Sequence, residues 1–129
     1  MKAIIIPCTQ EKVWDTAPDR GAVPAKDAYA KPVFRKWREH AEQSGVAWFV
    51  LSTKYGLLSP DDLIEPYNVP VSAALTNLGL HALLEDQGRR LGLDRAEEVT
   101  LIDWEKFQPL VRAAVGNASV PCKLGKLYY

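Results

Sequence analysis

Three lysines are the residues of this sequence whose chemistry could define a function. Lys12, Lys26 and Lys54 lie in segments without helix or strand patterns. A lysine acts as a nucleophile or a base only while its amine is neutral, which burial or a neighbouring cation favours by lowering the pKa. A loop lysine is ordinarily a solvated surface charge, so each of the three also has this simpler interpretation. We take Lys12 and Lys54 as candidate catalytic residues, and Lys12 rises above the surface-charge interpretation only because of a motif given below.

Three carboxylates could supply a general acid or base beside such a lysine. Asp61, Asp62 and Glu65 are close in sequence, and carboxylates that crowd into a cleft raise one another's pKa. Asp61 and Asp62 have an alternative role in the first turn of a short helix. Glu65 stands between Ile64 and Pro66, an apolar setting in which an unpaired carboxylate is costly. We therefore predict Glu65 as the catalytic acid.

Uncharged side chains near these positions could bind a planar substrate. Tyr55, Tyr67 and Trp14 could stack on a nucleobase, as aromatic platforms do in nucleotide sites, or could pack as ordinary half-buried aromatics. Cys8 could be a small buried hydrophobe or a nucleophile, but no histidine lies near it in sequence to activate the thiol, so we assign it a supporting role. The predicted substrate-binding residues are Cys8, Thr9, Ser52, Tyr55, Gly56 and Tyr67.

The composition limits the classes of protein to which the chain can belong. Its 129 residues, 47% of them hydrophobic, suit one domain with one core. The 16 basic residues balance 16 acidic ones, so any contact with nucleic acid must be local. The N-terminal apolar run is too short for a signal peptide and no stretch approaches a membrane span, so we expect a cytoplasmic protein. Two distant cysteines, and two histidines without ligand spacing, predict free thiols and neither a metal nor a cofactor.

Apolar strands that alternate with amphipathic helices predict an α/β domain. Residues 2–6 contain three consecutive isoleucines and residues 46–52 a continuous apolar run, and both patterns are typical of buried strands. A helix over residues 32–44 completes a βαβ unit, whose two parallel strands end at the same edge of the sheet. The loops that carry Lys12 and Lys54 should therefore open on one edge.

Turn residues and periodicity predict the remaining elements. Residues 13–30 contain prolines and a glycine without periodicity, so they should form an irregular surface loop. We further expect a short helical turn at 60–64, a helix at 73–91 with Leu75, Leu78, Ala82 and Leu83 on its apolar face, a strand at 98–102, a helix capped by Asp103, and a strand or tail at 118–124. The whole chain, 1–129, is predicted to be a single three-layer α/β/α domain with a mostly parallel sheet of about four strands.

Two motifs resemble those of a known superfamily. Residues 7–12, PCTQEK, resemble the Pro-Cys-Ser-x-x-Lys motif of the archaeosine synthase core domain, with Thr9 in place of Ser. Residues 51–71, LSTKYGLLSPDDLIEPYNVPV, resemble the second signature of that superfamily and the Tyr-Gly-Leu-Leu-Arg-Pro stretch of the YaaA peroxide-stress proteins. They also resemble small YaaA-related (DUF6884-like) bacterial and phage proteins with the pattern Ser-Ala-Lys-Tyr-Gly-Leu-Leu-x-Pro-Asp-x-x-Ile-Glu-Pro-Tyr.

The resemblance implies a role for Lys12. The motif lysine of archaeosine synthase adds to the nitrile of 7-cyano-7-deazaguanine in RNA and forms an amidine, although Val13 to Thr16 replace the Pro-Tyr and Ser-x-Ser-His that follow that lysine. YaaA-like relatives are instead linked to DNA binding and oxidative stress. We therefore expect an enzyme that acts on a nucleobase or modified nucleotide, with a 7-deazaguanine as the implied substrate. The alternative is a nucleic-acid-binding stress or phage accessory protein without chemistry.

Overall fold

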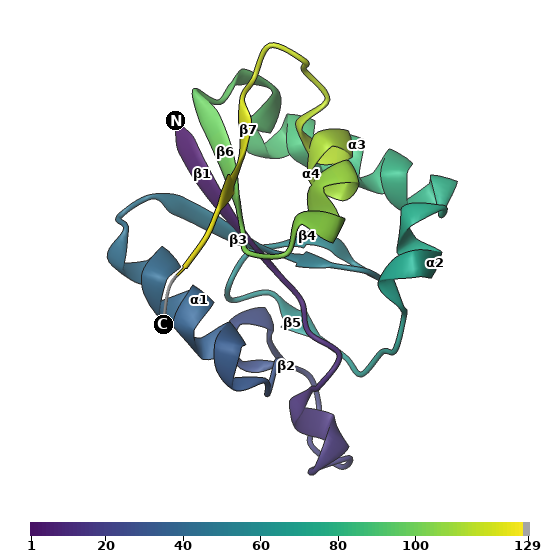
Figure 1. Ribbon diagram of the computed structural model, residues 1–129. Helices are drawn as coiled ribbons and strands as arrows, with labels where there is room; N and C mark the ends of the chain where they lie inside the picture. Colours follow the sequence, from purple (N-terminus) through teal and green to yellow (C-terminus); the bar gives the residue numbers. More distant parts are fainter. Residues whose placement is uncertain (128–129) are drawn as a thin grey trace.

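The computed structural model describes residues 1–127, whose strands form a five-stranded sheet in the order β4-β3-β1-β6-β7 (Figure 1). The parallel strands are β1 (Lys2–Pro7), β3 (Ala47–Ser52), β6 (Glu98–Ile102) and β7 (Cys122–Gly125), and β4 (Gly56–Leu58) pairs with β3 in the antiparallel direction. The predicted α/β fold with a mostly parallel sheet is confirmed. β4 was not predicted, because three residues are too few to show a strand pattern in the sequence.

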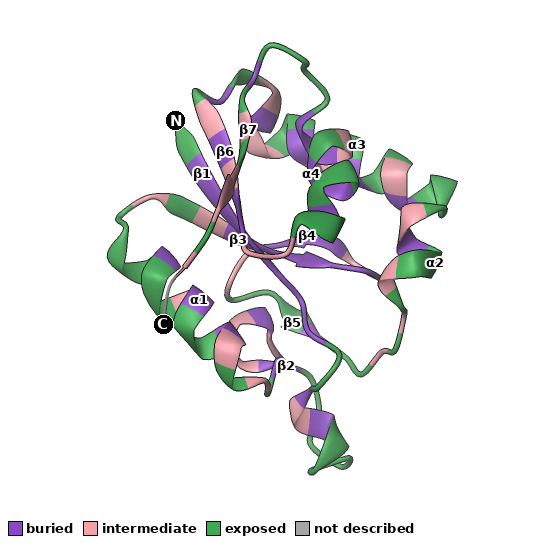
Figure 2. Cartoon of the chain, viewed as in Figure 1, coloured by how far each residue is buried: buried purple, intermediate pink, exposed green. Residues whose placement is uncertain are grey.

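Helices cover both faces of this sheet. α1 (Pro32–Gln43) packs on one face, and α3 (Leu78–Leu91) and α4 (Gln108–Val115) pack against each other on the opposite face (Figure 1). The central strands β1 and β3 are buried along most of their length (Figure 2). This burial explains their continuous apolar sequences, since a strand covered on both faces has no solvent side to alternate with. None of the helices within residues 1–127 has the length and apolar character that a membrane crossing requires.

The helix predicted at 73–91 is two helices. α2 (Val71–Leu75) ends at Thr76, and α3 begins after Asn77. The Asn77 side chain accepts a hydrogen bond from the Leu80 N–H at 3.0 Å. Asparagine is a strong N-cap residue, because its side-chain oxygen satisfies one of the N–H groups that a helix start leaves unpaired. The chain therefore starts a new helix at this point.

The apolar face of α3 also differs from the prediction. Leu80, Leu84 and Gly88 face the core, whereas Leu78 is 83% exposed and Leu83 is 39% exposed. The predicted face assumed one continuous helix from residue 73, and the break before α3 changes which side chains point inward. Gly88 marks the contact with α4, because a Cβ at this position would lie 1.5 Å from the Ala114 carbonyl oxygen.

Residues 13–30 and 60–64 pair with each other. Of the predicted helical turn at 60–64, the last two residues form β5 (Leu63–Ile64), which pairs antiparallel with β2 (Val23–Pro24). The segment predicted as irregular also holds two 3-10 turns, η1 (Val13–Asp15) and η2 (Ala25–Asp27). Both predictions fail for the same reason, since the strand partner of each segment lies about forty positions away in sequence.

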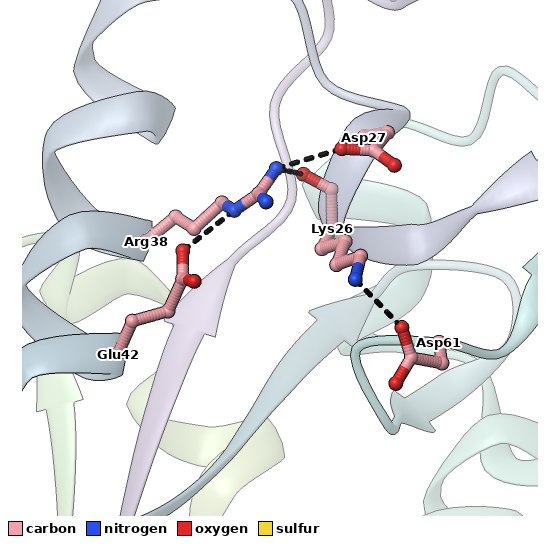
Figure 3. Close-up of polar contacts among 5 residues, drawn as sticks. All are labelled: Lys26, Asp27, Arg38, Glu42 and Asp61. Carbon is pink, nitrogen blue, oxygen red and sulfur yellow. Dashed lines mark hydrogen bonds and ion pairs between the residues drawn. The ribbon is translucent and has the colours of Figure 1, made fainter. Parts of the chain in front are cut away.

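Ion pairs attach this two-stranded layer to its surroundings (Figure 3). Arg38 of α1 bonds to the Asp27 carboxylate at 2.7 Å and to the Lys26 carbonyl at 3.0 Å, and it also pairs with Glu42. The Lys26 amine pairs with Asp61 at 2.8 Å. Lys26 and Asp61 therefore have structural partners at the protein surface, and the hydrogen bonds of Arg38 hold η2 against α1.

The segment after β6 turns more sharply than predicted. Asp103 does not cap the following helix: it has a φ of +59°, and the Trp104 N–H donates to the Ile102 carbonyl at 2.8 Å. This is the geometry of a γ-turn, a strained conformation that needs outside support. The Asp103 carboxylate supplies support by accepting from the Trp37 indole N–H and the Leu127 N–H, both at 2.8 Å. The 3-10 turn η4 (Glu105–Phe107) then leads into α4, and η3 (Leu93–Arg95) leads from α3 towards β6.

Candidate active-site cleft

A cleft of about 1070 Å³ lies at the carboxyl ends of the parallel strands. The segments that follow β1, β3 and β6 all contribute to it, and the loop before α2 forms another wall. β1 and β6 are neighbours, but the chain leaves β1 towards α1 on one face and leaves β6 towards α4 on the other. Ligands in open α/β sheets bind where the chain diverges in this way. The topology therefore makes this cleft the candidate site.

Lys12 lies buried in this cleft. The residue is 6% exposed, and its amine donates to the Gln10 carbonyl at 3.1 Å and lies 4.5 Å from the centroid of the Tyr67 ring. Burial lowers the pKa of the amine below its usual 10.5, while nearby Cys8 and Asp15 act in the opposite direction. None of the ion pairs within residues 1–127 includes Lys12. At a given pH, a larger fraction of the Lys12 amine is therefore neutral than would be the case for a lysine on the surface.

The backbone around Lys12 holds the loop after β1 in place. The Cys8 N–H donates to the Leu51 carbonyl at 3.0 Å, which continues the pairing of β1 with β3 by one residue. The buried Thr9 hydroxyl donates to the Glu11 carbonyl at 2.9 Å, and the Lys12 N–H donates to the Asp15 carboxylate at 3.0 Å. Lys12 therefore sits on a loop whose own polar groups are satisfied and whose position is determined by the sheet.

Cys8 is a buried free thiol beside Lys12. Burial raises the pKa of this thiol, and the Thr53 backbone, the Tyr67 hydroxyl and the Lys12 charge only partly oppose the rise. A buried thiol with a raised pKa is a poor nucleophile, because the thiolate is the reactive form. Cys8 therefore lines the cleft as a neutral group.

Three tyrosines form a cluster next to the Lys12 amine. The Tyr67 and Tyr29 hydroxyls are 2.7 Å apart, and the Tyr55 ring packs edge-on against Tyr67 with centroids 5.5 Å apart. Burial raises the pKa of both Tyr29 and Tyr67. Tyr29 is absent from the predicted site because it falls in the segment predicted as an irregular loop. The two hydroxyls stay protonated and can act as hydrogen-bond donors.

Ser52 and Gly56 shape the turn between β3 and β4. The Ser52 hydroxyl is buried and accepts from the N–H groups of Lys54 and Tyr55 at 3.1 and 3.0 Å. Gly56 has a φ of +74°, a conformation that glycine adopts without a steric cost. Neither residue lines the cleft. Their contribution to the site is to position Thr53, whose hydroxyl donates to the Val69 carbonyl at 2.8 Å.

Lys54 and Glu65 are exposed, and neither is among the residues that line the cleft. The Lys54 amine lies 5.1 Å from the centroid of the Tyr55 ring, and the Glu65 N–H contacts the Tyr55 hydroxyl at 3.4 Å. Trp14 is buried, with its indole N–H donating to the Gly21 carbonyl at 3.1 Å. The structure therefore brings Cys8, Thr9 and Lys12 together with Tyr67, and it places the other two predicted catalytic residues beside Tyr55.

Most residues that line the cleft are missing from the prediction, among them Lys31, Trp104 and Lys106. Lys31 precedes α1, and Trp104 and Lys106 follow β6. A signal for Trp104 and Lys106 was present in the sequence, because they follow the predicted strand at 98–102, and parallel strands end at one edge. That inference requires knowing that β6 lies beside β1, which the sequence pattern does not reveal.

Comparisons with known proteins identify the family of the chain. Residues 4–79 match a family of unknown function (DUF6884). An uncharacterized protein, YfjM of Bacillus subtilis (strain 168), is 33% identical over 114 residues, which cover 88% of this chain and 76% of that protein. The family match includes the loops with Cys8, Lys12 and Tyr67, whereas Trp104 and Lys106 lie beyond it. The chain therefore belongs to the DUF6884 family of unknown function.

Proposed function

We propose that the chain is an enzyme that acts on a nucleobase or modified nucleotide, with Lys12 as the reacting amine. The observation that carries the proposal is a buried lysine in a cleft at the carboxyl ends of parallel strands. Its amine faces an aromatic ring and a carbonyl in place of a carboxylate. Such surroundings lower the cost of the neutral, nucleophilic form.

The proposed reaction is addition of the Lys12 amine to an electrophilic carbon of the base, such as the nitrile of a 7-deazaguanine. The lone pair of Nζ forms a new C–N bond while one π bond of the nitrile breaks. The nitrile nitrogen gains a proton and Nζ loses one, so the product is an amidine and no oxidant or reductant is needed. The Cys8 thiol and the Tyr67 hydroxyl, which burial keeps protonated, are the neighbouring groups that can assist this proton transfer.

Intact-mass measurement tests this proposal. The protein is incubated with a panel of bases that carry a nitrile or a carbonyl, with borohydride added in the carbonyl case to trap the adduct. We expect an adduct on the wild type and none on Lys12→Arg, because arginine keeps the charge but stays protonated. Lys123→Arg is the control, since this lysine lies on β7 outside the cleft and arginine can keep its pair with Glu98.

The pH dependence provides a second criterion. Because burial lowers the pKa of Lys12, the rate of adduct formation should rise with pH and level off below the usual lysine value of 10.5. An unmodified wild type across the whole panel, or equal adducts on Lys12→Arg, would contradict the proposal.

Two further lysines that line the cleft, half-buried Lys31 and exposed Lys106, support the alternative function. Lys31 and Lys106 could contact phosphates, as expected for a nucleic-acid-binding protein without chemistry. A gel-shift titration at increasing salt separates the two functions. If the protein binds duplex DNA with an affinity that falls as salt increases, and if Lys12→Ala leaves that affinity unchanged, the result would favour a DNA-binding protein without chemistry.

A further inference from the structure

We infer that the substrate is a phosphorylated nucleoside, and that Lys31 and Lys106, held beside Trp104, bind its phosphate at the rim of the cleft. The inference rests on the proposed function and names its class of ligand: a mononucleotide in place of a free base. Lys12 then reacts with the base while the two other lysines hold the phosphate.

The two amines are close to one aromatic ring. The Lys31 amine lies 5.0 Å and the Lys106 amine 4.9 Å from the centroid of the Trp104 ring. Within residues 1–127, neither amine takes part in an ion pair or a hydrogen bond. The electron-rich face of an indole attracts cations but leaves their charge uncompensated. Two cations gathered in this way repel each other, and an anion bound beside them removes the repulsion.

Trp104 is fixed in place. Its backbone follows the γ-turn at Asp103, and its ring packs edge-on against Trp37 at 4.9 Å and parallel to Phe107 at 6.2 Å between centroids. Asp103 also accepts the indole N–H of Trp37, so the turn and the aromatic cluster support each other. The ring therefore holds the two amines in a defined region of the cleft before any ligand arrives, which lowers the entropic cost of binding.

The two lysines come from opposite walls of the crevice. Lys31 precedes α1, to which the chain runs from β1, and Lys106 lies in η4, on the way from β6 to α4. These two connections diverge to opposite faces of the sheet, and Lys12 lies on the loop after β1. A ligand between the walls can therefore meet all three amines, since all of them line one cleft.

Charge and size favour a mononucleotide. Lysines at positions 12, 31 and 106 line the cleft against two carboxylates, and the Asp15 carboxylate already accepts the Lys12 N–H. Glu11 is the second carboxylate, so the lining has one more basic than acidic side chain, and the positive charge beside Trp104, from Lys31 and Lys106, suits a phosphate. The volume of about 1070 Å³ lies just above the range of roughly 300–1,000 Å³ typical of small-molecule sites, and it exceeds the needs of a base alone.

Calorimetric titration tests the inference with the four common ribonucleosides and their 5′-monophosphates as probes. For at least one base, we expect the monophosphate to bind the wild type about tenfold more tightly than the nucleoside, as charge-assisted contacts to a phosphate should provide. In the double variant Lys31→Gln/Lys106→Gln, that advantage should fall to about threefold or less, with nucleoside affinity unchanged. The control Arg20→Gln/Arg35→Gln makes the same change in net charge at exposed positions outside the cleft and should keep the full advantage.

A second measurement does not depend on the lysine variants. The indole N–H resonance of Trp104, assigned with Trp104→Phe, should shift on titration with the monophosphate and stay in place with the nucleoside. The inference is overturned if phosphate adds nothing to the affinity of the wild type, if the double variant keeps the advantage, or if only a single-stranded oligonucleotide binds.

The adduct experiment separates this inference from the proposed function. A Lys12-dependent adduct without any preference for the phosphate would refute the inference and leave the enzyme proposal standing. A preference for the phosphate that requires Lys31 and Lys106, without any adduct on Lys12, would keep the nucleotide site and refute the proposed chemistry.

Discussion

Replacing Gly88 by alanine should destabilise the protein strongly, against the usual effect of this substitution in a helix. Alanine in place of a helical glycine ordinarily gains up to about 1 kcal/mol. At Gly88 the new Cβ would lie 1.5 Å from the Ala114 carbonyl oxygen and 2.6 Å from its carbon, both of them backbone atoms of α4. Because an ordinary contact begins at 3.4 Å, the two helices would have to separate by about 2 Å.

The expected magnitude follows from this separation. Overpacking of a core ordinarily costs about 1–3 kcal/mol, and here no flexible side chain can move aside, so we expect a net loss of about 2–4 kcal/mol. Urea unfolding followed by circular dichroism measures the change in the free energy of unfolding. Gly79→Ala in the same helix is the matched control, because its closest neighbour is the Asn77 side-chain oxygen at 3.2 Å, and its stability should stay within about 1 kcal/mol of the wild type. If Gly88→Ala proves as stable as Gly79→Ala, the close approach of α3 to α4 at Gly88 is wrong.

Two further predictions concern the surroundings of the site. Asp103→Ala should lower the free energy of unfolding by about 3 kcal/mol, because the buried Trp37 indole N–H loses its acceptor. The control Glu105→Ala, at an exposed position, should change the free energy of unfolding by less than about 0.5 kcal/mol. If urea unfolding shows equal effects for the two variants, Asp103 does not support the turn. Burial raises the pKa of Tyr67 and Tyr29 above the usual 10.0, so above that pH the unfolded chain loses these protons while the folded protein retains them, and stability falls as pH rises. Tyr67→Phe should therefore lose less stability than the wild type between about pH 8 and about pH 11, as measured by urea midpoints, and an equal loss in both proteins would contradict the buried state of this hydroxyl.

Four elements could be predicted from local sequence. The strands at 2–6, 46–52 and 98–102 and the helix at 32–44 agree with β1, β3, β6 and α1 to within one residue at each end. Their patterns are local properties, because a continuous β-branched run or a helical stripe reflects which faces of that one segment are covered. The position of Lys12 on the loop after β1 followed from the same kind of argument.

The elements that could not be predicted depend on distant partners. β4 and β5 are two or three residues long and exist because β3 and β2 offer backbone groups to pair with. The turn at Asp103 depends on its carboxylate accepting the N–H groups of Trp37 and Leu127, which are distant in sequence. A single stretch of sequence does not contain these partners, so it does not determine the conformation.

The candidate site divides in the same way. The sequence alone located the part of the site on the loop after β1, because Cys8, Thr9 and Lys12 directly follow a strand that its isoleucines make recognisable. Only the tertiary structure decided which other loops meet that part. The pairing of β6 with β1 brings Trp104 and Lys106 into the cleft, while the turn into antiparallel β4 leaves Lys54 outside it. The physical reason is that membership of a cleft depends on the order and direction of neighbouring strands, which backbone hydrogen bonds between distant segments establish.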